Sequence, residues 1–548
     1  MPARVRPVPP RLDLPRLLEV IRLSAGELGV EAFLVGGFVR DRLLGRASKD
    51  IDVVVVGADG VPLLERVAAQ LGWARPAVFE RFATAQIRGG EFIVEVVQAR
   101  AERYDPESRK PDVRPGSLED DIARRDFTIN ALVETLDGRV LDLTGRGLDD
   151  LRDGILRTPL DPADTFSEDP LRMFRAARFV AQLGFRLAGG LEEVMRAMAH
   201  RASILSGERV RDELSRLLVS PHPREGLEVL RSSGLLAVSL PELLPMVGVE
   251  QGGWHLYDVW EHSVRAVELA PADLVTRLGC LFHDSGKPPT HAMAADGRHT
   301  FYDHPRAGAR IAASVMTRLR FSGEEIDQVG TLVLHHMWPI QYRPAEVGDG
   351  AVRRFIRTVG ELRPRLLDLA RADTRASAYP DVEAIDELEQ RTARLDAGSQ
   401  VSRLRPPLDG RVLMELAGRG PGPWVGRAQR ALLDAVLDGE IPADDPVAAR
   451  GFVEGHPELL RDCPRRLESE VRGDACRVTG ACVQPREAGP SSSSRNRRVF
   501  SGGSRPEKIC SRRSSASSVR SMPVSRRSIW MSSSSSPMRS AISLRARR

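Results

Sequence analysis

The chain has 548 residues, of which 42% are hydrophobic, so it is longer than one hydrophobic core usually serves and several domains are expected. It contains no apolar run of the roughly 18 residues that a membrane span needs. Its first residues, MPARVRPVPPRLDLP, lack the apolar stretch of a secretory signal. Composition therefore argues against a membrane partner and favours a cytoplasmic protein.

Charge and cysteine content exclude further simple interpretations. The formal charge is +5, but residues 488 to 548 hold 14 Lys and Arg residues against one acidic residue, which leaves −8 for residues 1 to 487. Global charge is thus no evidence for nucleic-acid binding, and any basic contact surface has to be local. Only Cys280 precedes residue 460, so the cysteines suggest neither a disulfide framework nor a thiolate zinc site.

In chain order, the first segments predict a mixed α/β region. Residues 16–30 have a helical pattern, while 33–35, 50–56 and 91–97 are rich in β-branched residues and predict strands. From about residue 155 the pattern changes to amphipathic helices such as DPLRMFRAARFVAQLGF and ERVRDELSRLL. The body that follows is therefore expected to be all-α.

The segment LVGGFVRDRLLG predicts a strand, a glycine turn and a helix that begins near Phe38. Glycines at such a turn let backbone N–H groups approach phosphates, and the helix N-terminus favours an anion there. Gly36, Gly37 and Arg40 are therefore candidates for contacting a triphosphate. A tight turn without a ligand is the alternative for this segment taken alone.

Two aspartates follow in the segment DID. Because side chains alternate along a strand, Asp50 and Asp52 should project from one face. Adjacent carboxylates repel unless a cation lies between them, and Mg²⁺ held by carboxylates and substrate phosphates is the natural solution. Glu95, inside a later apolar strand, is a candidate third catalytic acid on the metal side, and exposure on an edge strand is its open alternative.

These motifs resemble those of a known family. GGFVRDRLLG followed by SKDIDVVV is similar to the signature of the polymerase-beta-like nucleotidyltransferases, specifically the bacterial (class II) CCA-adding and poly(A) polymerase family. RKPDVRPGSLEDDIARRDFTINAL resembles that family's flexible loop and RRDFTINA motif, TFSEDPLRMFRAARFVAQLGF its EDxxR helix, and ERVRDELSRLL its next block. The resemblance covers about residues 25 to 245. It implies triphosphate contacts by Gly37 and Arg40, Mg²⁺ binding by Asp50 and Asp52, and nucleotide contacts by Arg125 and Asp126.

Selection of the base is expected to depend on the segment SEDPLR. Ser167 suits an N-cap, so a helix is predicted to start there, with Asp169 and Arg172 three residues apart and adjacent on its surface. Asp169 accepts and Arg172 donates hydrogen bonds, which matches the amino donor and ring-nitrogen acceptor of cytosine and adenine, whereas uracil and guanine present the reverse order. Helix capping is the alternative role of the acidic residues. The resemblance assigns base recognition to this pair and extends it to Arg175 and Arg178, although helical geometry turns Arg178 about 180° from Asp169.

The motif RRDFTINAL supplies a further acceptor next to the expected nucleotide. Asp126 can accept a hydrogen bond from a ribose 2′-OH and so discriminate against deoxynucleotides. A salt bridge with Arg124 or Arg125 is its structural alternative. Asn130 is expected to be structural.

Eight of the eleven histidines lie between residues 255 and 336. Repeated His and Asp on helix-like segments, with an adjacent His-Asp pair, resemble the HD phosphohydrolase superfamily, which coordinates divalent metal for phosphoester hydrolysis. The expected ligands of a divalent transition metal or Mg²⁺ are His262, His283, Asp284, His304, His335 and Asp373. His336 is an alternative to His335, and Lys287 is a candidate phosphate contact. A helical scaffold for tRNA that has lost its metal is the alternative for the whole region.

Together these interpretations predict an α+β protein with a polymerase-beta-like nucleotidyltransferase head, followed by an all-α neck, body and HD domain. The tail is rich in Ser and Arg and is expected to be disordered, because it cannot bury enough apolar surface to fold. The expected segments are an N-terminal segment (1–24), the head (25–154), the nucleotide-selecting and RNA-binding neck (155–245), the HD domain (246–385), a C-terminal helical region (386–465) and the tail (466–548).

The expected activity is template-independent addition of CMP and AMP from CTP and ATP to the tRNA 3′ end by two-metal phosphoryl transfer. The expected partners are therefore the tRNA 3′ end, ATP and CTP, and the sequence does not define an oligomeric state. Poly(A) addition and A-only or CC-only addition share these motifs and stay open. A signalling protein that pairs a nucleotidyltransferase with an HD hydrolase is the more distant alternative, because protein modification does not need a base-selecting pocket.

Overall fold

A computed structural model describes residues 13–79, 84–103, 112–252, 256–399 and 401–461. The expected Ser/Arg-rich tail, the first twelve residues and the letters RKP of the expected flexible loop lie outside the described residues. Within the described ranges, no helix has the length and apolar character needed to cross a membrane.

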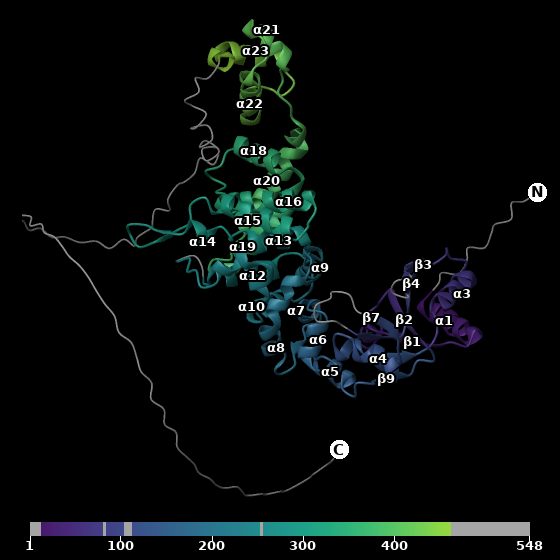
Figure 1. The fold of residues 1–548 in the computed structure, drawn as a ribbon. Coiled ribbons are helices and arrows are strands. Elements are labelled where there is room, and N and C mark those ends of the chain that lie inside the picture. Colours follow the sequence, from purple (N-terminus) through teal and green to yellow (C-terminus); the bar gives the residue numbers. More distant parts are fainter. Residues whose placement is uncertain (1–12, 80–83, 104–111, 253–255, 400, 462–548) are drawn as a thin grey trace, which may run out of the picture. The chain divides into compact units, whose positions relative to one another are not determined.

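The head contains a seven-stranded sheet with the strand order β3-β4-β5-β2-β1-β8-β9 (Figure 1). β2 and β5 are parallel and the remaining neighbours are antiparallel. The strands expected from the sequence correspond to β1, β2 and β5. The strands are β1 (Glu31–Val35), β2 (Asp50–Val56), β3 (Ala77–Phe79), β4 (Thr84–Gly89), β5 (Phe92–Gln98), β6 (Arg100–Arg103), β7 (Asp112–Pro115), β8 (Val133–Thr135) and β9 (Val140–Leu141), and β6 pairs with β7 outside the large sheet. The head helices are α1 (Leu14–Leu28), α2 (Gly37–Leu43), α3 (Val61–Leu71), α4 (Leu118–Ala123) and α5 (Gly147–Asp153).

Alternation along the strands gives the sheet two unlike faces. On one face, Ile51, Val53 and Val94 are fully buried in the core to which α1 and α3 contribute, and these two helices lie side by side along the sheet (Figure 1). On the other face, Val54 belongs to a smaller apolar cluster that includes α4. This second face is covered by less apolar surface, which leaves room for polar side chains.

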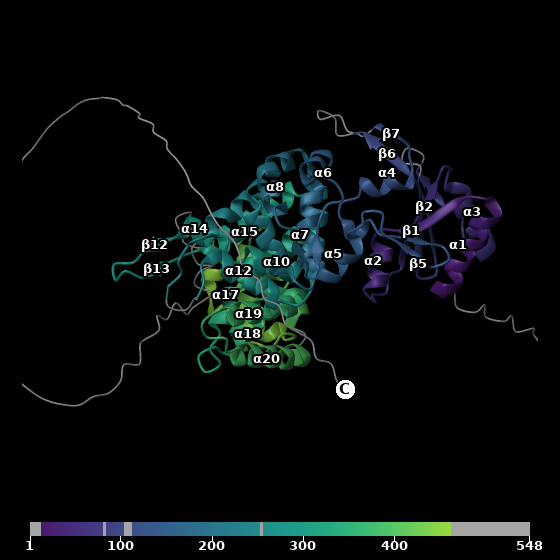
Figure 2. The ribbon, with the colours of Figure 1, turned by 90° about the horizontal axis from the view of Figure 1, so that it is seen from below.

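The rest of the described chain is helical, with two short strand pairs, and the expected fold class is confirmed (Figure 2). The neck and body helices are α6 (Pro162–Glu168), α7 (Leu171–Leu183), α8 (Leu191–Met198), α9 (Gly207–Leu218), α10 (Pro223–Ser232) and α11 (Leu235–Ser239). The histidine-rich region contains α12 (Val259–Leu269), α13 (Leu274–Phe282), α14 (Lys287–Thr290), α15 (His304–Arg318), α16 (Gly323–His335), α17 (Met337–Gln341), α18 (Asp349–Val359) and α19 (Arg363–Ala376). The last helices are α20 (Glu383–Ser399), α21 (Gly410–Ala417), α22 (Pro423–Asp438) and α23 (Pro446–Gly455), and the strand pairs are β10 (Ile155–Leu156) with β11 (Arg186–Leu187) and β12 (Ala292–Met293) with β13 (His299–Thr300).

Most buried apolar residues form one continuous core, but α21 to α23 enclose a second core around Trp424. The domain limits expected from the sequence stay a prediction.

The helix expected to start at Ser167 is divided in two. Ser167 lies inside α6, whose N-cap is Asp161, and a new helix begins at Leu171. A proline ring disfavours helical backbone in the residue before it, and Asp169, which precedes Pro170, has φ −138° and ψ 101°. The proline therefore interrupts the helix and places Asp169 in the break.

Candidate functional site

The two aspartates of β2 lie on the sheet face opposite α1 and α3. Ile51, between them, is fully buried on the other face, so Asp50 and Asp52 share one face. β5 runs parallel to β2, and the register places Glu95 directly beside Asp52. Since β5 lies between β4 and β2, the explanation of Glu95 by an edge strand is wrong.

The surroundings of Asp52 disfavour its negative charge, and a bound cation would offset this cost. Burial, together with the carboxylates of Glu95 and Asp50, raises the pKa of Asp52 to about 6, although the guanidinium groups of Arg125 and Arg40 oppose this rise. Hard divalent cations prefer carboxylate oxygens as ligands. The donor set of this face therefore fits a divalent metal ion.

The glycine turn brings the start of α2 against this acidic face. Gly36 has a positive φ of 72°, and a Cβ atom there would lie 3.1 Å from Asp52 Oδ2 and 3.0 Å from Arg125 Nη1. Glycine therefore allows both the turn and the close approach. Arg40, one turn into α2, is buried and binds Asp41 with Nε and Nη2 at 2.8 and 2.9 Å.

Asn130 connects Arg40 to Asp126. Arg40 Nη1 donates to Asn130 Oδ1 at 2.6 Å, and Asn130 Nδ2 donates to Asp126 Oδ1 at 2.9 Å. The other oxygen of Asp126 lies 2.6 Å from Arg175 Nη2. Burial alone would raise the pKa of Asp126, but the charge of Arg175 and the hydrogen bonds from Asn130 and Phe127 hold it below the ordinary value. Asp126 is therefore a carboxylate acceptor within a chain of polar contacts.

Arg124 and Arg125 bind a different acid from the one expected. Both guanidinium groups form ion pairs with Asp121, whose side chain is fully buried. The alternative in which Asp126 only pairs with one of these arginines is therefore wrong. The backbone carbonyl of Arg124 accepts a hydrogen bond from Arg172 Nη2 at 2.5 Å, which links the head to α7.

These groups open onto a cavity of about 570 Å³ between the sheet of the head and helices α7 and α9. Asp52 and Glu95 line it, whereas Asp50 is not among its lining residues. Every nucleotide-contact residue expected from the sequence contributes to the lining: Gly36, Gly37, Arg40, Arg125, Asp126, Asp169, Arg172, Arg175 and Arg178.

The expected helical pairing of Asp169 and Arg172 is wrong, because Asp169 precedes the helix that carries Arg172. Asp169 Oδ1 accepts the backbone N–H two residues along at 3.0 Å, and its Oδ2 accepts from Arg209 Nη2 at 2.8 Å. Arg172 donates to Glu168 Oε2 at 2.8 Å as well as to the carbonyl of Arg124. The Asp169 carboxylate and the Arg172 guanidinium still both line the cavity. They are positioned by the break between α6 and α7, not by the spacing of residues along one helix.

Arg178 also lies in the cavity, although helical geometry was expected to turn it away from Asp169. The expectation assumed that Asp169 and Arg178 lie on one helix, in which side-chain directions turn by about 100° per residue. Asp169 lies outside α7, so this rule does not relate the two side chains. Arg178 Nε lies 2.5 Å from Glu213 Oε2, and its guanidinium carbon lies 4.0 Å from the ring centroid of Phe179. Glu213 was missed by the sequence interpretation. Its signal was a charged residue on the apolar face of α9, one position before Leu214.

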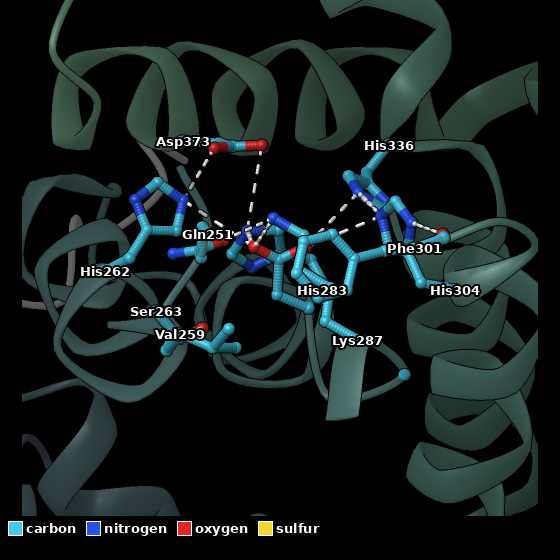
Figure 3. Close-up of polar contacts among 12 residues, drawn as sticks. Gln251, Val259, His262, Ser263, His283, Lys287, Phe301, His304, His336 and Asp373 are labelled. Atoms are coloured by element: carbon cyan, nitrogen blue, oxygen red, sulfur yellow. Dashed lines mark hydrogen bonds and ion pairs between the residues drawn. The ribbon is translucent and has the colours of Figure 1, made fainter. Parts of the chain in front are cut away.

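A second cluster of side chains lies in the histidine-rich helices (Figure 3). His262 comes from α12, His283 and Asp284 from the end of α13, His304 from the start of α15, His336 from the end of α16 and Asp373 from α19. His262 Nε2 lies 2.9 Å from Asp373 Oδ1, and His283 Nε2 lies 3.2 Å from Asp284 Oδ2. His304 Nε2 lies 3.5 Å from Asp284 Oδ1 and 3.3 Å from His336 Nε2. All six side chains are buried.

The ligand atoms of this cluster form two groups that share Asp284. His262 and His283 complete one group, and His304 and His336 complete the other, with the atoms of each group within 4.8 Å of one another. Asp284 Oδ2 lies 2.7 Å from Lys287 Nζ and 3.2 Å from His283 Nε2, whereas no described residue donates a hydrogen bond to Asp284 Oδ1. Buried polar atoms without hydrogen bonds are costly unless an ion engages them, so the donor set fits a divalent metal.

Backbone carbonyls orient three of the histidines. In each, Nδ1 lies at hydrogen-bond distance from a carbonyl oxygen, which can only accept, so Nδ1 carries the proton and Nε2 faces the cluster. The three pairs, with distances of 2.7, 2.9 and 2.8 Å, are His283–Cys280, His304–Phe301 and His336–Val333.

The charges of the cluster separate the pKa values of its histidines. Burial alone would lower the pKa of His283, but Asp284 and Asp373 raise it to about 9. Burial and the neighbouring histidines lower the pKa of His336 to about 3. Without a metal, His283 is therefore an imidazolium beside Asp284 at neutral pH.

His335 lies outside the cluster, so its assignment as a ligand is wrong and His336 takes its place. Successive helical residues differ by about 100° in direction, and only one of two neighbours faces a given point. Lys287 Nζ lies 2.7 Å from Asp284 Oδ2 and donates to Gln251 Oε1 at 2.5 Å. Gln251 was missed, because a lone glutamine before the histidine-rich region gives no sequence signal.

Family models of known domains match three parts of the chain. Residues 32–157 match the poly A polymerase head domain, residues 184–246 match the "probable RNA and SrmB- binding site of polymerase A", and residues 255–396 match the HD domain. Fold and site therefore define a polymerase-beta-like nucleotidyltransferase with a helical body and an HD domain. Nucleotidyltransferase and HD families generally use divalent metal ions.

Individual relatives narrow the class. The chain is 37% identical to the A-adding tRNA nucleotidyltransferase of Deinococcus radiodurans over 77% of its own length and 95% of the relative. It is also 37% identical to the CC-adding tRNA nucleotidyltransferase of Thermus thermophilus, over 77% and 93%. The CCA-adding enzyme of Bacillus stearothermophilus, solved in complex with CTP, shares the fold with a TM-score of 0.61 at 24% identity, over 82% of this chain and all of that chain. The chain belongs to the family of tRNA nucleotidyltransferases.

Proposed function

We propose that this protein extends the 3′ end of tRNA with CMP and AMP taken from CTP and ATP, without a template. The observation that carries the proposal is one cavity onto which the acidic side chains Asp52 and Glu95, the Gly36–Gly37 turn, and the pair Asp169 and Arg172 all open. The A-adding and the CC-adding relative are each 37% identical to the chain, which supports both nucleotides as substrates. Because tRNA is the proposed substrate, we place the protein in the cytoplasm.

In the proposed reaction, the 3′ oxygen of the RNA forms a bond to the α-phosphorus of the nucleotide. The bond from that phosphorus to the bridging β-phosphate oxygen breaks, pyrophosphate leaves, and the proton of the 3′ hydroxyl is released to solvent. Asp50 and Asp52, with Glu95 beside them, would hold Mg²⁺, which would supply charge stabilisation at the phosphates and favour ionisation of the attacking hydroxyl. Arg40 and the N–H groups of the Gly36–Gly37 turn bind the triphosphate.

The remaining lining residues position the nucleotide. Asp126 accepts the ribose 2′-OH, and Arg125 contacts the nucleotide beside Gly36. Asp169 accepts from the amino group of cytosine or adenine, while Arg172 donates to the ring nitrogen. Uracil and guanine would leave these groups unpaired, at a cost of about 1–3 kcal/mol per group.

Transfer is tested with tRNA transcripts that end before CCA, after C and after CC, each incubated with one labelled nucleotide and Mg²⁺. The proposal predicts CMP on the first two transcripts, AMP on the third, and neither UMP nor GMP. Incorporation of only AMP, or of only CMP, would assign the chain to one of the partial activities. Homopolymeric A on unrelated RNA would instead show a poly(A) polymerase.

The second cluster of side chains, called the HD cluster from here on, favours a second activity. Its members are His262, His283, Asp284, His304, His336 and Asp373. We propose that it binds a divalent transition metal or Mg²⁺ and hydrolyses a phosphomonoester or a 2′,3′-cyclic phosphate, with Lys287 beside Asp284 as a phosphate contact. The cluster variant H283A/D284A is expected to lose this hydrolysis, whereas His335→Ala, next to the cluster but outside it, should keep it. Equal hydrolysis by the wild type and the double variant would refute the assignment.

A further inference from the structure

Helix α9 forms a wall of the nucleotide cavity, and the proposed function leaves it without a role. Arg209, Glu213 and Arg216 are spaced by four and three residues and so lie on one side of this helix. Arg209 and Arg216 line the cavity, and Glu213 binds Arg178 of α7. The helix therefore presents charged groups to the residues proposed to recognise the nucleotide.

Arg209 makes the most direct of these contacts. Its Nη2 donates to Asp169 Oδ2 at 2.8 Å, while the backbone N–H of Leu171 donates to Asp169 Oδ1 at 3.0 Å. Two donors on different oxygens fix the plane of a carboxylate. Each carboxylate oxygen has two lone pairs, so an acceptor site remains for a base amino group.

Arg209 is not the only guanidinium group near Asp169. Asp169 lies close enough to Arg175 to raise the pKa of that side chain, after larger contributions from other groups. Arg172 is held by Glu168 and by the carbonyl of Arg124. Without Arg209, the carboxylate of Asp169 is free to turn toward these neighbouring guanidinium groups, and the acceptor would no longer point at the base.

We propose that Arg209 is a specificity-determining positioning residue, which holds the Asp169 carboxylate in the orientation that accepts cytosine and adenine. Arg209 is 49% exposed at its side chain, so the ion pair contributes little to stability and its effect is on orientation. This inference rests on the proposed function, because it assigns base reading to Asp169.

The test compares kcat/KM for CTP and UTP on a tRNA that ends before CCA. Arg209→Ala is expected to lower the preference for CTP over UTP about 10-fold, with the KM for tRNA and the thermal midpoint unchanged. Arg209→Lys should recover part of the preference. Arg211→Ala is the matched control on the same helix, because Arg211 binds Asp212 and the carbonyl of Arg320 and is not among the cavity-lining residues.

A second variant separates the inference from the function on which it rests. Asp169→Ala should abolish the preference, because it removes the acceptor, and adding Arg209→Ala to it should cause no further loss, because Arg209 acts through Asp169. If Asp169→Ala loses the preference and Arg209→Ala keeps it, the role of Arg209 is refuted while base reading by Asp169 stands. If both variants keep the preference, base reading itself fails. A loss for all nucleotides alike, or a raised KM for tRNA alone, would also overturn the role of Arg209.

Discussion

At Asp52, the catalytic role proposed above opposes stability at a single residue. Its side chain is half-buried beside Glu95 and within the field of Asp50, and the partial burial and these charges raise its pKa to about 6 from an ordinary 3.8. Below pH 4 the group is protonated in both the folded and the unfolded chain. Between pH 4 and 6 the unfolded chain loses its proton first, so the free energy of unfolding falls as the pH rises, and the full penalty is present above pH 6.

The variant Asp52→Asn should therefore stabilise the metal-free protein while it abolishes nucleotide transfer. At pH 7.5 in EDTA we expect a gain of about 1–2 kcal/mol in the free energy of unfolding, because the neutral amide avoids the penalty of a half-buried anion. At pH 4 the gain should vanish. Urea denaturation at both pH values measures this, with Asp50→Asn as the exposed control that should change stability less. A variant less stable than the wild type at pH 7.5 would contradict the electrostatic account.

Some of these residue positions follow from the sequence and others do not. The shared face of Asp50 and Asp52 follows from the two-residue period of a strand, which holds wherever the strand is regular. The position of Asp169 does not follow from helical spacing, because Pro170 divides the helix. The choice between His335 and His336 depends on the direction of α16, which is set by packing between helices far apart in the sequence.

At the scale of elements, close packing between a turn and a helix builds the HD cluster. Gly286 follows the His283–Asp284 pair, and a Cβ atom at this position would lie 2.0 Å from the carbonyl oxygen of His304 and 2.6 Å from the backbone nitrogen of Gly308. The missing side chain therefore lets the turn after α13 lie directly on α15. This contact brings His304, at the start of α15, to Asp284.

Gly286→Ala should separate the turn from α15 and disturb the metal site. Overpacking of this kind costs about 1–3 kcal/mol, so we expect a lower thermal midpoint and loss of bound metal, measured by elemental analysis after dialysis. Gly330→Ala is the control within α16, since a Cβ atom there meets nothing within 4 Å and alanine favours a helix. Full metal content in Gly286→Ala would show that α15 adjusts without moving its ligand.

The elements themselves were largely predictable, because α7 and α9 follow a helical apolar pattern and β2 and β5 are rich in β-branched residues. Their partners were not. The sheet order that places β5 inside the sheet, and the packing of α9 against α7 that brings Glu213 to Arg178, are set by contacts between distant segments. A local pattern reports which face of an element is apolar, but it does not report which element covers that face.

At the scale of the whole molecule, two sites suited to divalent metals draw on separate elements of one chain. The cavity site uses β2, β5, the Gly36–Gly37 turn, α7 and α9, whereas the HD cluster uses α12, α13, α15, α16 and α19. No side chain described belongs to both sites. Effects of changes at distant sites without shared partners usually add, so the two activities should respond independently.

We therefore expect Asp52→Asn to lose nucleotide addition by at least about 100-fold and to keep hydrolysis within about twofold, because the loss of a metal ligand is local. The cluster variant H283A/D284A should show the reverse, and its retained addition of CMP and AMP would show that the protein is still folded. Both activities are to be measured on the same preparations, with the triple variant as the additivity check. A loss of nucleotide addition in H283A/D284A, at an unchanged thermal midpoint, would mean that the HD cluster acts on the transfer site. The chain would then operate as one coupled enzyme, with the body helices between the sites as the elements to examine.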